Sequence, residues 1–149
     1  MTAQALIKAF LEPRKLAIAG MSRSGKKFGN IIFKTLTDKG YEMLPVHPEN
    51  LEFLGAKSYG SIADLPVGVE NLVLVIPPAA TEEMVRLIPG SGIKRVWMQQ
   101  GAESDTAIQY CEDHGIDVVH HACVLMHAEP KGIHKFHRWL GGVFGKLPR

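Results

Sequence analysis

One loop of this chain gathers the residue types that bind phosphate, at the spacing of a turn between a strand and a helix. Residues 20–29 are Gly-Met-Ser-Arg-Ser-Gly-Lys-Lys-Phe-Gly, so three glycines and three cations lie within ten positions. At such a turn, free backbone N–H groups and the positive end of a helix dipole point into one small space, and both attract an anion. The loop therefore predicts a phosphate-binding site, and the rest of the sequence must indicate which phosphate ligand it takes.

Two common phosphate ligands fit this loop poorly. Gly20 to Lys26 follows the G-x-x-x-x-G-K pattern of nucleoside triphosphatases, but Lys27 stands where a Ser or Thr hydroxyl would bind Mg²⁺. In the nicotinamide dinucleotide pattern Ser22 replaces a glycine, and the second strand ends at His47-Pro48 without the acid that binds the ribose of NAD. NADP needs no acid there, so an NADP-dependent or other nucleotide-dependent enzyme is an alternative prediction.

Coenzyme A fits the loop better, because it carries a pyrophosphate and a 3′-phosphate and needs no metal. Arg23, Lys26 and Lys27 could supply charge-assisted hydrogen bonds to these phosphates. Ser22 and the N–H groups at the start of the following helix could hold the pyrophosphate. We therefore expect coenzyme A, free or acylated, as the ligand.

Alternating strand and helix patterns must position this loop. The unbroken apolar run from Leu72 to Ile76 is typical of a parallel strand that is covered on both faces. We expect an irregular segment over 49–68, an N-terminal helix over 2–12, strands over 15–19, 41–46, 71–76, 95–98 and 117–120, helices over 28–38, 80–88 and 103–114, and a C-terminal helical tail over 130–149. This order predicts an α/β fold in a single domain over 1–149, a Rossmann-like doubly wound parallel sheet of about five strands flanked by helices.

Ligands of doubly wound sheets bind outside the carboxyl ends of the strands, at the point where the strand order reverses. Each predicted strand is followed by a short segment in which the apolar pattern stops. These segments are 20–29, 46–48, 76–78, 99–101 and 120–123. Together they are the predicted surroundings of the ligand.

Several stretches of the sequence resemble a known family. In chain order they are Lys15 to Ser22, Lys27 to Gly29, Gly40-Tyr41, Pro45 to Pro48, Leu54 to Tyr59, Ile76 to Pro78 and Val96 to Gly101. They resemble the stand-alone CoA-binding domain family, which is related to the N-terminal domain of the succinyl-CoA synthetase α subunit. The similarity covers about residues 13–127, and the order and spacing of the stretches carry it rather than any single motif.

The resemblance implies a CoA site made from the ends of several strands. The first loop would hold the CoA phosphates, the loop after the second strand would lie near the adenosine, and later loops would lie along the pantetheine arm. In that order the implied residues are Gly20, Met21, Ser22, Arg23, Lys26, Lys27, Phe28 and Gly29, then Val46, His47 and Pro48, then Ile76, Pro77, Pro78, Gln99 and Gly101. The family commonly has Asn-Pro where this chain has His47-Pro48, so different hydrogen bonds are expected there.

Cys123 follows the last predicted strand on the ligand side of the sheet, and we include it in the cofactor site. Its thiol could approach the thiol of CoA and form a mixed disulfide under oxidising conditions. The alternative is a small buried apolar residue. Cys111 lies within a predicted helix, where only the buried apolar role is expected.

The histidines of the C-terminal third support a different hypothesis. They are His114, His120, His121, His127, His134 and His137. His121, Cys123 and His127 offer ligand types that zinc accepts, and His134 and His137 lie one helical turn apart. No standard metal-ligand spacing is met, so we assign no metal ligands and keep a metal-binding or partner-docking module as an alternative.

Composition limits the classes of partner and the cellular compartment that we expect. The 149 residues carry a formal net charge of +2, with 46% hydrophobic and 21% charged residues, which is ordinary for a globular domain and too mild for a nucleic-acid partner. The cysteines suggest no disulfide framework, the N-terminus lacks the pattern of a signal peptide, and no apolar run reaches the length of a membrane span. We therefore predict a cytoplasmic protein without a membrane partner. The amphipathic end helices could support a homo-oligomer.

Catalysis is not predicted. No Ser-His-Asp order, pair of carboxylates or metal triad stands out, so we assign no catalytic residue. The expected function is binding of CoA or acyl-CoA, as a carrier, sensor or regulator.

Overall fold

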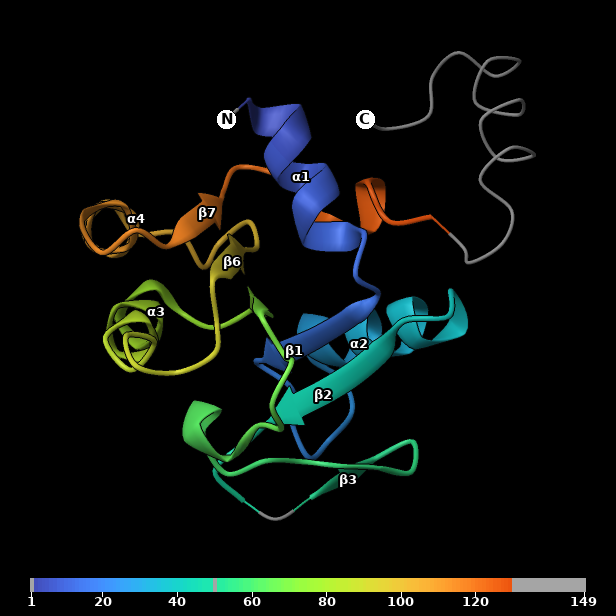
Figure 1. Ribbon diagram of the computed structural model, residues 1–149. Helices are drawn as coiled ribbons and strands as arrows, with labels where there is room; N and C mark the ends of the chain where they lie inside the picture. Colours follow the sequence, from blue (N-terminus) through green and yellow to red (C-terminus); the bar gives the residue numbers. More distant parts are fainter. Residues whose placement is uncertain (1, 50, 130–149) are drawn as a thin grey trace, which may run out of the picture.

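The computed structural model describes residues 2–49 and 51–129, and the helical tail predicted over 130–149 lies outside them. Parallel strands form a five-stranded sheet in the order β2-β1-β5-β6-β7, which confirms the predicted Rossmann-like fold (Figure 1). The strand bounds are β1 Lys15–Ala19, β2 Glu42–Val46, β5 Asn71–Leu74, β6 Arg95–Met98 and β7 Asp117–Val119. The flanking helices are α1 Ala3–Leu11, α2 Phe28–Asp38, α3 Pro78–Val85 and α4 Asp105–Asp113, with 3₁₀ turns at η1 Ile62–Asp64 and η2 Val124–Met126.

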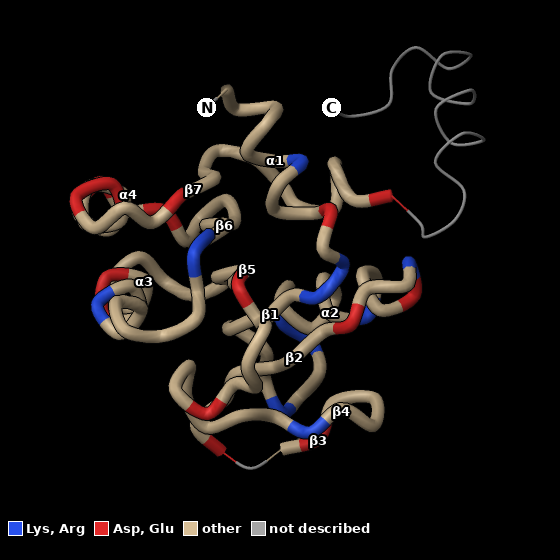
Figure 2. The backbone as a smooth tube through the Cα atoms, in the orientation of Figure 1, with Lys and Arg blue, Asp and Glu red and all other residues tan. Residues whose placement is uncertain are grey.

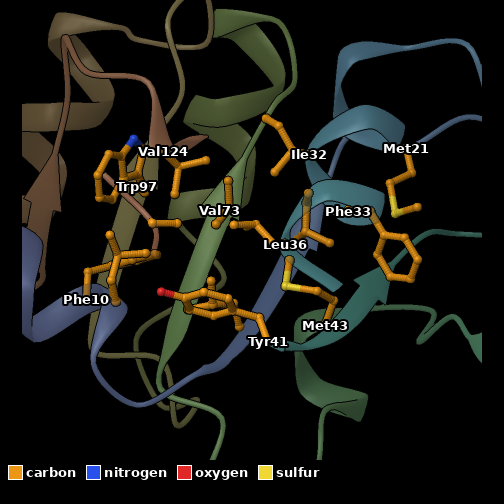
Figure 3. Close-up of a cluster of buried hydrophobic side chains, with 14 of the residues drawn as sticks. Phe10, Met21, Ile32, Phe33, Leu36, Tyr41, Met43, Val73, Trp97 and Val124 are labelled. Carbon is orange, nitrogen blue, oxygen red and sulfur yellow. The ribbon is translucent and has the colours of Figure 1, made fainter. Parts of the chain in front are cut away.

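The sheet has a hydrophobic core on each face, because alternate residues of a strand point to opposite sides. Helices α1 and α2 cover one face, where they pack on side chains such as Ile18 and Trp97. Figure 3 shows this cluster, in which Phe10 of α1 meets Trp97 edge-on with 5.3 Å between the ring centroids. Helices α3 and α4 cover the other face, over Leu72 and Leu74. Burial on both faces explains the unbroken apolar runs of the central strands, such as residues 72–74 of β5 and 96–98 of β6.

The strand order reverses between β1 and β5. From β1 the chain passes through α2 to β2 on one side, and it later returns to β5 on the other side of β1. Ala19, the last residue of β1, is in register with Val46 of β2 and with Leu74 of β5. A crevice at the carboxyl ends of β1 and β5 is where ligands bind in this type of fold. The segments predicted to follow the strands all start at this same edge of the sheet.

Helix α3 differs from its predicted bounds at both ends. It begins at Pro78 rather than at residue 80, because a proline in the first helical turn has a helical φ and needs no partner for a backbone N–H. It ends at Val85 rather than at residue 88. There the chain tightens to hydrogen bonds between residues three apart, such as Ile88 N–H to the carbonyl oxygen of Val85.

The segment over 49–68 contains a hairpin that the sequence did not predict. Strands β3 (Glu52–Phe53) and β4 (Ala56–Lys57) pair in antiparallel fashion around Leu54-Gly55, whose φ values are 50° and 84°. Positive φ at both turn residues is what a two-residue hairpin requires. The chain then runs beside β2, where Tyr59 N–H donates to the carbonyl oxygen of Pro45 at 2.8 Å. These contacts fix the segment after β2 against the sheet edge.

Candidate functional site

The loop after β1 contacts its neighbours closely at two glycines. Gly20 has φ +121°, and a Cβ atom there would lie 2.2 Å from the carbonyl oxygen of Val75, which follows β5. Gly29 lies in the first turn of α2, and its Cβ would lie 2.4 Å from the carbonyl oxygen of Gly20. Since only glycine permits such contacts, the loop, α2 and the segment after β5 meet in one backbone junction. Gly25 has φ +75° with open space around it, so it serves the turn alone.

Asn30, in the first turn of α2, holds the loop in place. The N–H of Ser22 donates to Asn30 Oδ1 at 2.9 Å, and Asn30 Nδ2 donates to the carbonyl oxygen of Ser22 at 3.1 Å. The Ser22 hydroxyl lies 2.9 Å from that of Ser24. Sequence reasoning missed Asn30. The available signal was an amide side chain in the first turn of a helix that follows a glycine-containing loop.

Replacing Asn30 by alanine is expected to lower the free energy of unfolding by about 1–2 kcal/mol, because both amide hydrogen bonds of a half-buried side chain are lost. Urea unfolding followed by circular dichroism measures the change. Thr37→Ala, at an exposed position of the same helix, is the control and should change stability by no more than about 0.5 kcal/mol. Equal stability of the two variants would show that the amide pairing contributes nothing.

Helix α2 begins without the capping that α1 and α4 have. Side-chain oxygens of Thr2 and Ser104 cap α1 and α4, whereas Lys27 makes no capping hydrogen bond and the first turn of α2 contains no acid. Within the described part of the chain, the N–H groups of Phe28 and Gly29 have no acceptor. These donors at the positive end of the helix dipole are available to an anion.

Positive side chains gather at the same helix end. Lys26 and Lys27 are exposed, and neither forms an ion pair with a carboxylate of residues 2–49 or 51–129. The two ammonium groups repel each other and the positive end of the helix dipole. A bound anion would remove this repulsion and so stabilise the helix end. Elsewhere basic and acidic segments are interspersed along the described chain (Figure 2).

Arg23 differs from the two lysines, because its guanidinium forms an ion pair with Glu49. Glu49 follows His47-Pro48 at the end of β2, and its N–H donates to His47 Nδ1 at 3.1 Å. The loops after β1 and β2 therefore meet at the carboxyl edge of the sheet. The structure brings the predicted residues of these two loops together, and Glu49 is a further residue there that the sequence prediction did not include.

Two apolar residues of the predicted site have their side chains in the core. Met21 is 5% exposed and lies beside Phe33 (Figure 3), and Val46 is 6% exposed. To a ligand at the sheet edge such residues can offer only backbone groups. Phe28 is 44% exposed at the start of α2, so its ring is accessible.

The segment after β5, on the other side of the strand-order reversal from β2, is apolar. Ile76, Pro77 and Pro78 follow β5, and both prolines are exposed. Neither proline has an N–H group, so the start of α3 offers fewer donors than the start of α2. This surface suits an uncharged part of a ligand rather than a phosphate.

Gln99 and Cys123 lie further along the sheet edge, because they follow β6 and β7, which are two and three positions away from β1. Gln99 is 2% exposed, and its amide is used inside the protein. Its Nε2 donates to Cys123 Sγ at 2.9 Å, and its Oε1 accepts from Val124 N–H at 3.0 Å. Gly101 is exposed with φ +94°. Gln99 and Cys123 thus contact each other, and the turn η2 that follows Cys123 packs against α2.

A comparison with known protein families identifies the domain to which this candidate site belongs. A family model described as "CoA binding domain" matches residues 14–129, which include every strand of the sheet. The chain belongs to the CoA-binding domain family. The family inferred from the sequence is thereby confirmed.

The CoA-binding domain resembles proteins of quite different length. The uncharacterized protein YneT of Bacillus subtilis is 28% identical over 134 residues, which cover 86% of this chain and 96% of YneT. The α subunit of ADP-forming acetate–CoA ligase II of Pyrococcus furiosus is 29% identical over 92 residues, which cover 61% of this chain but 20% of that subunit. The solved structure of a conserved hypothetical protein of Pyrococcus furiosus has a TM-score of 0.71 at 38% identity, covering 75% of this chain and 97% of that one.

Some of the C-terminal histidines lie in the described part of the CoA-binding domain, namely His114, His120, His121 and His127. His134 and His137 lie outside it. In that part, no group of three or more His, Cys, Asp or Glu side chains is placed to hold a metal ion. His127 packs against Trp97, and burial lowers its pKa.

Among the helices in the described ranges, none is both long enough and apolar enough to cross a membrane.

Proposed function

We propose that this domain binds coenzyme A or an acyl-CoA reversibly, with the CoA phosphates at the N-terminus of α2. The observation that carries the proposal is the combination of two free N–H donors, on Phe28 and Gly29, with two cations, Lys26 and Lys27, that have no counter-charge in the described chain. The family indicates the class of ligand, and this helix end is the best place for its phosphates.

The pyrophosphate would accept hydrogen bonds from these N–H groups while the two ammonium groups neutralise its charge. The junction of Gly20 with Gly29 supports this arrangement, because neither residue has a side chain that would shield the backbone from a ligand. Ser22, held by Asn30, would add its hydroxyl group on the same side.

The rest of the ligand would extend in two directions from the pyrophosphate. The adenosine would lie towards the loop after β2, because the ribose of a nucleotide lies at the end of the second strand in doubly wound sheets. The pantetheine arm would lie along Ile76, Pro77 and Pro78, where the surface is apolar and poor in donors. Beyond them, Gly101 and Cys123 would be nearest to the thiol end.

We further propose that the domain binds without turnover, as a carrier, sensor or regulator. The aligned segment of the acetate–CoA ligase is 20% of that subunit, so its activity is that of a much longer protein. A Rossmann-like domain with one phosphate site at a strand-to-helix turn is sufficient for binding.

Charge reversal at Lys27 tests the phosphate site. Lys27→Glu is expected to weaken CoA binding more than about tenfold, because a charge-assisted contact is lost and a repulsive one replaces it. Lys34→Glu is the matched control, since Lys34 is an exposed cation further along the same helix. The affinity of this variant for CoA should stay within about twofold of wild type. Unchanged affinity in Lys27→Glu would show that the phosphates bind elsewhere.

Calorimetry with CoA, acetyl-CoA, NADP and ADP tests the ligand class. Binding of CoA or acetyl-CoA, with acetyl-CoA recovered intact after the titration, supports the proposal. Tight binding of NADP without binding of CoA would replace it with a nicotinamide-dependent function. Hydrolysis of acetyl-CoA or transfer of its acetyl group would contradict the proposed absence of turnover.

A further inference from the structure

Two charged side chains from neighbouring strand ends meet beside the proposed phosphate site. The guanidinium of Arg23, in the loop after β1, pairs with the carboxylate of Glu49, in the loop after β2. Their side chains are 69% and 53% exposed. An ion pair this exposed is worth little, because water competes for both groups and salt screens them. A stronger anion can therefore displace Glu49 from Arg23 at small cost.

The backbone around each partner is fixed although the pair itself is exposed. Asn30 holds Ser22, next to Arg23, by two hydrogen bonds. The N–H of Glu49 donates to His47 Nδ1 at 3.1 Å, and its carbonyl oxygen accepts from the hydroxyl of Ser58 at 3.0 Å. A change of partner at Arg23 therefore needs only side-chain rotation and no movement of either loop.

The position of the pair matters because the ribose of a bound nucleotide lies at the end of the second strand in this type of fold. An acid there binds the free ribose hydroxyls, and an arginine nearby binds a phosphate on the ribose. This chain has both groups in place, bound to each other. Glu49 therefore favours a ligand with free ribose hydroxyls, and Arg23 favours one with a ribose phosphate. Because the two side chains are paired, a ligand that binds one of them must release the other.

We propose that Arg23 binds the 3′-phosphate of the CoA ribose and that Glu49 competes with this phosphate, so that the pair determines specificity for a phosphorylated ribose. The inference rests on the proposed CoA function and names the residues that would distinguish CoA from dephospho-CoA. A phosphate monoester has up to two negative charges and three acceptor oxygens, and it can accept two parallel hydrogen bonds from one guanidinium. It therefore displaces a single carboxylate from Arg23. Dephospho-CoA lacks this group and leaves the ion pair intact.

The test compares the affinities of CoA and dephospho-CoA by calorimetry in five proteins at low salt. These are wild type, Arg23→Gln, Glu49→Gln, and two control variants, Lys34→Gln and Asp38→Asn. Lys34 and Asp38 form an exposed ion pair on α2, with side chains 64% and 65% exposed, so the controls remove equivalent charges away from the β2 loop. Thermal unfolding of each variant establishes that it is folded.

The expected results differ in direction between the two members of the pair. Arg23→Gln should weaken CoA about tenfold and leave dephospho-CoA within about twofold of wild type. Glu49→Gln should strengthen CoA about twofold to fivefold, because the competing carboxylate is gone, and should leave dephospho-CoA unchanged. Both controls should keep the wild-type ratio of the two affinities.

Three outcomes would overturn the inference, and they are distinguishable. If both ligands bind and their affinity ratio is the same in all five proteins, Arg23 does not bind the 3′-phosphate and the CoA function stands. If Glu49→Gln weakens CoA, the carboxylate assists binding instead of competing with it. If neither ligand binds to wild type, the proposed function itself fails, and the inference fails with it.

Discussion

Gly29→Ala is expected to destabilise the protein by about 3 kcal/mol and to abolish measurable CoA binding. Alanine is the better helix former by about 1 kcal/mol, so the local preference of α2 favours the substitution. The tertiary contact opposes it, because the added Cβ would lie 2.4 Å from the carbonyl oxygen of Gly20. Backbone atoms cannot rotate away as a side chain does, so α2 must shift from the loop that it helps to form. The repulsion therefore outweighs the helical preference.

Gly25→Ala is the matched control for this result. It lies in the same loop, but a Cβ there meets nothing within 4 Å, and only its φ of +75° opposes the change. A left-handed backbone conformation costs a residue with a Cβ about 1 kcal/mol. Urea unfolding of both variants, with calorimetry of CoA binding, measures the difference. If Gly29→Ala proves as stable as wild type, α2 and the loop after β1 are not in the close contact described.

Gln99→Leu is expected to destabilise the protein by about 2–3 kcal/mol. Gln99 is 2% exposed, and leucine, of similar size, leaves the N–H of Val124 without its acceptor in a buried place. Cys123 Sγ loses its hydrogen bond from the amide as well. The segment after β7 then loses both of its hydrogen bonds with Gln99 and keeps the one from Trp97 Nε1 to the carbonyl oxygen of Ala122, so it should also become more accessible to proteases.

The neighbouring Gln100 provides the control. It is exposed, so Gln100→Leu should change the free energy of unfolding by no more than about 0.5 kcal/mol. The CoA affinity of folded Gln99→Leu separates two roles for this residue. An affinity within twofold of wild type means that Gln99 holds the segment after β7, whereas a large loss means that it contacts the pantetheine arm as predicted from the sequence. Equal stability of the two leucine variants would contradict the buried hydrogen bonds.

The sheet and the edge that carries the site could be predicted from the sequence because both depend on local patterns. Strand β1 at 15–19 and helix α2 at 28–38 have their predicted bounds, since an apolar run, a glycine-containing loop and an amphipathic segment define them without tertiary information. The alternation of strand and helix then fixes where the strands end in space. The five segments after the strands follow from that rule.

Three features that the sequence did not predict are the role of Asn30, the role of Glu49 and the hairpin after β2. Asn30 looks like an ordinary helix residue until the structure places its amide on Ser22. The sequence shows no acid directly at the end of the second strand, but Glu49, two residues after His47, pairs with Arg23 there. The hairpin around Leu54-Gly55 lacks the usual Asn or Asp signal at its first turn residue. Asn30 and Glu49 each act through a contact with another segment, whereas the hairpin is local and its turn signal is weak.

The backbone junction at Gly20 and Gly29 also has a consequence for the rate of binding. A helix end packed directly on its loop cannot open without breaking that contact, so the N–H donors keep their orientation before any ligand arrives. Association then requires no ordering step at the phosphate end, and encounters driven by Lys26 and Lys27 should proceed at rates set by diffusion and ionic strength. Differences in affinity among CoA derivatives should therefore arise mainly from how slowly each one dissociates.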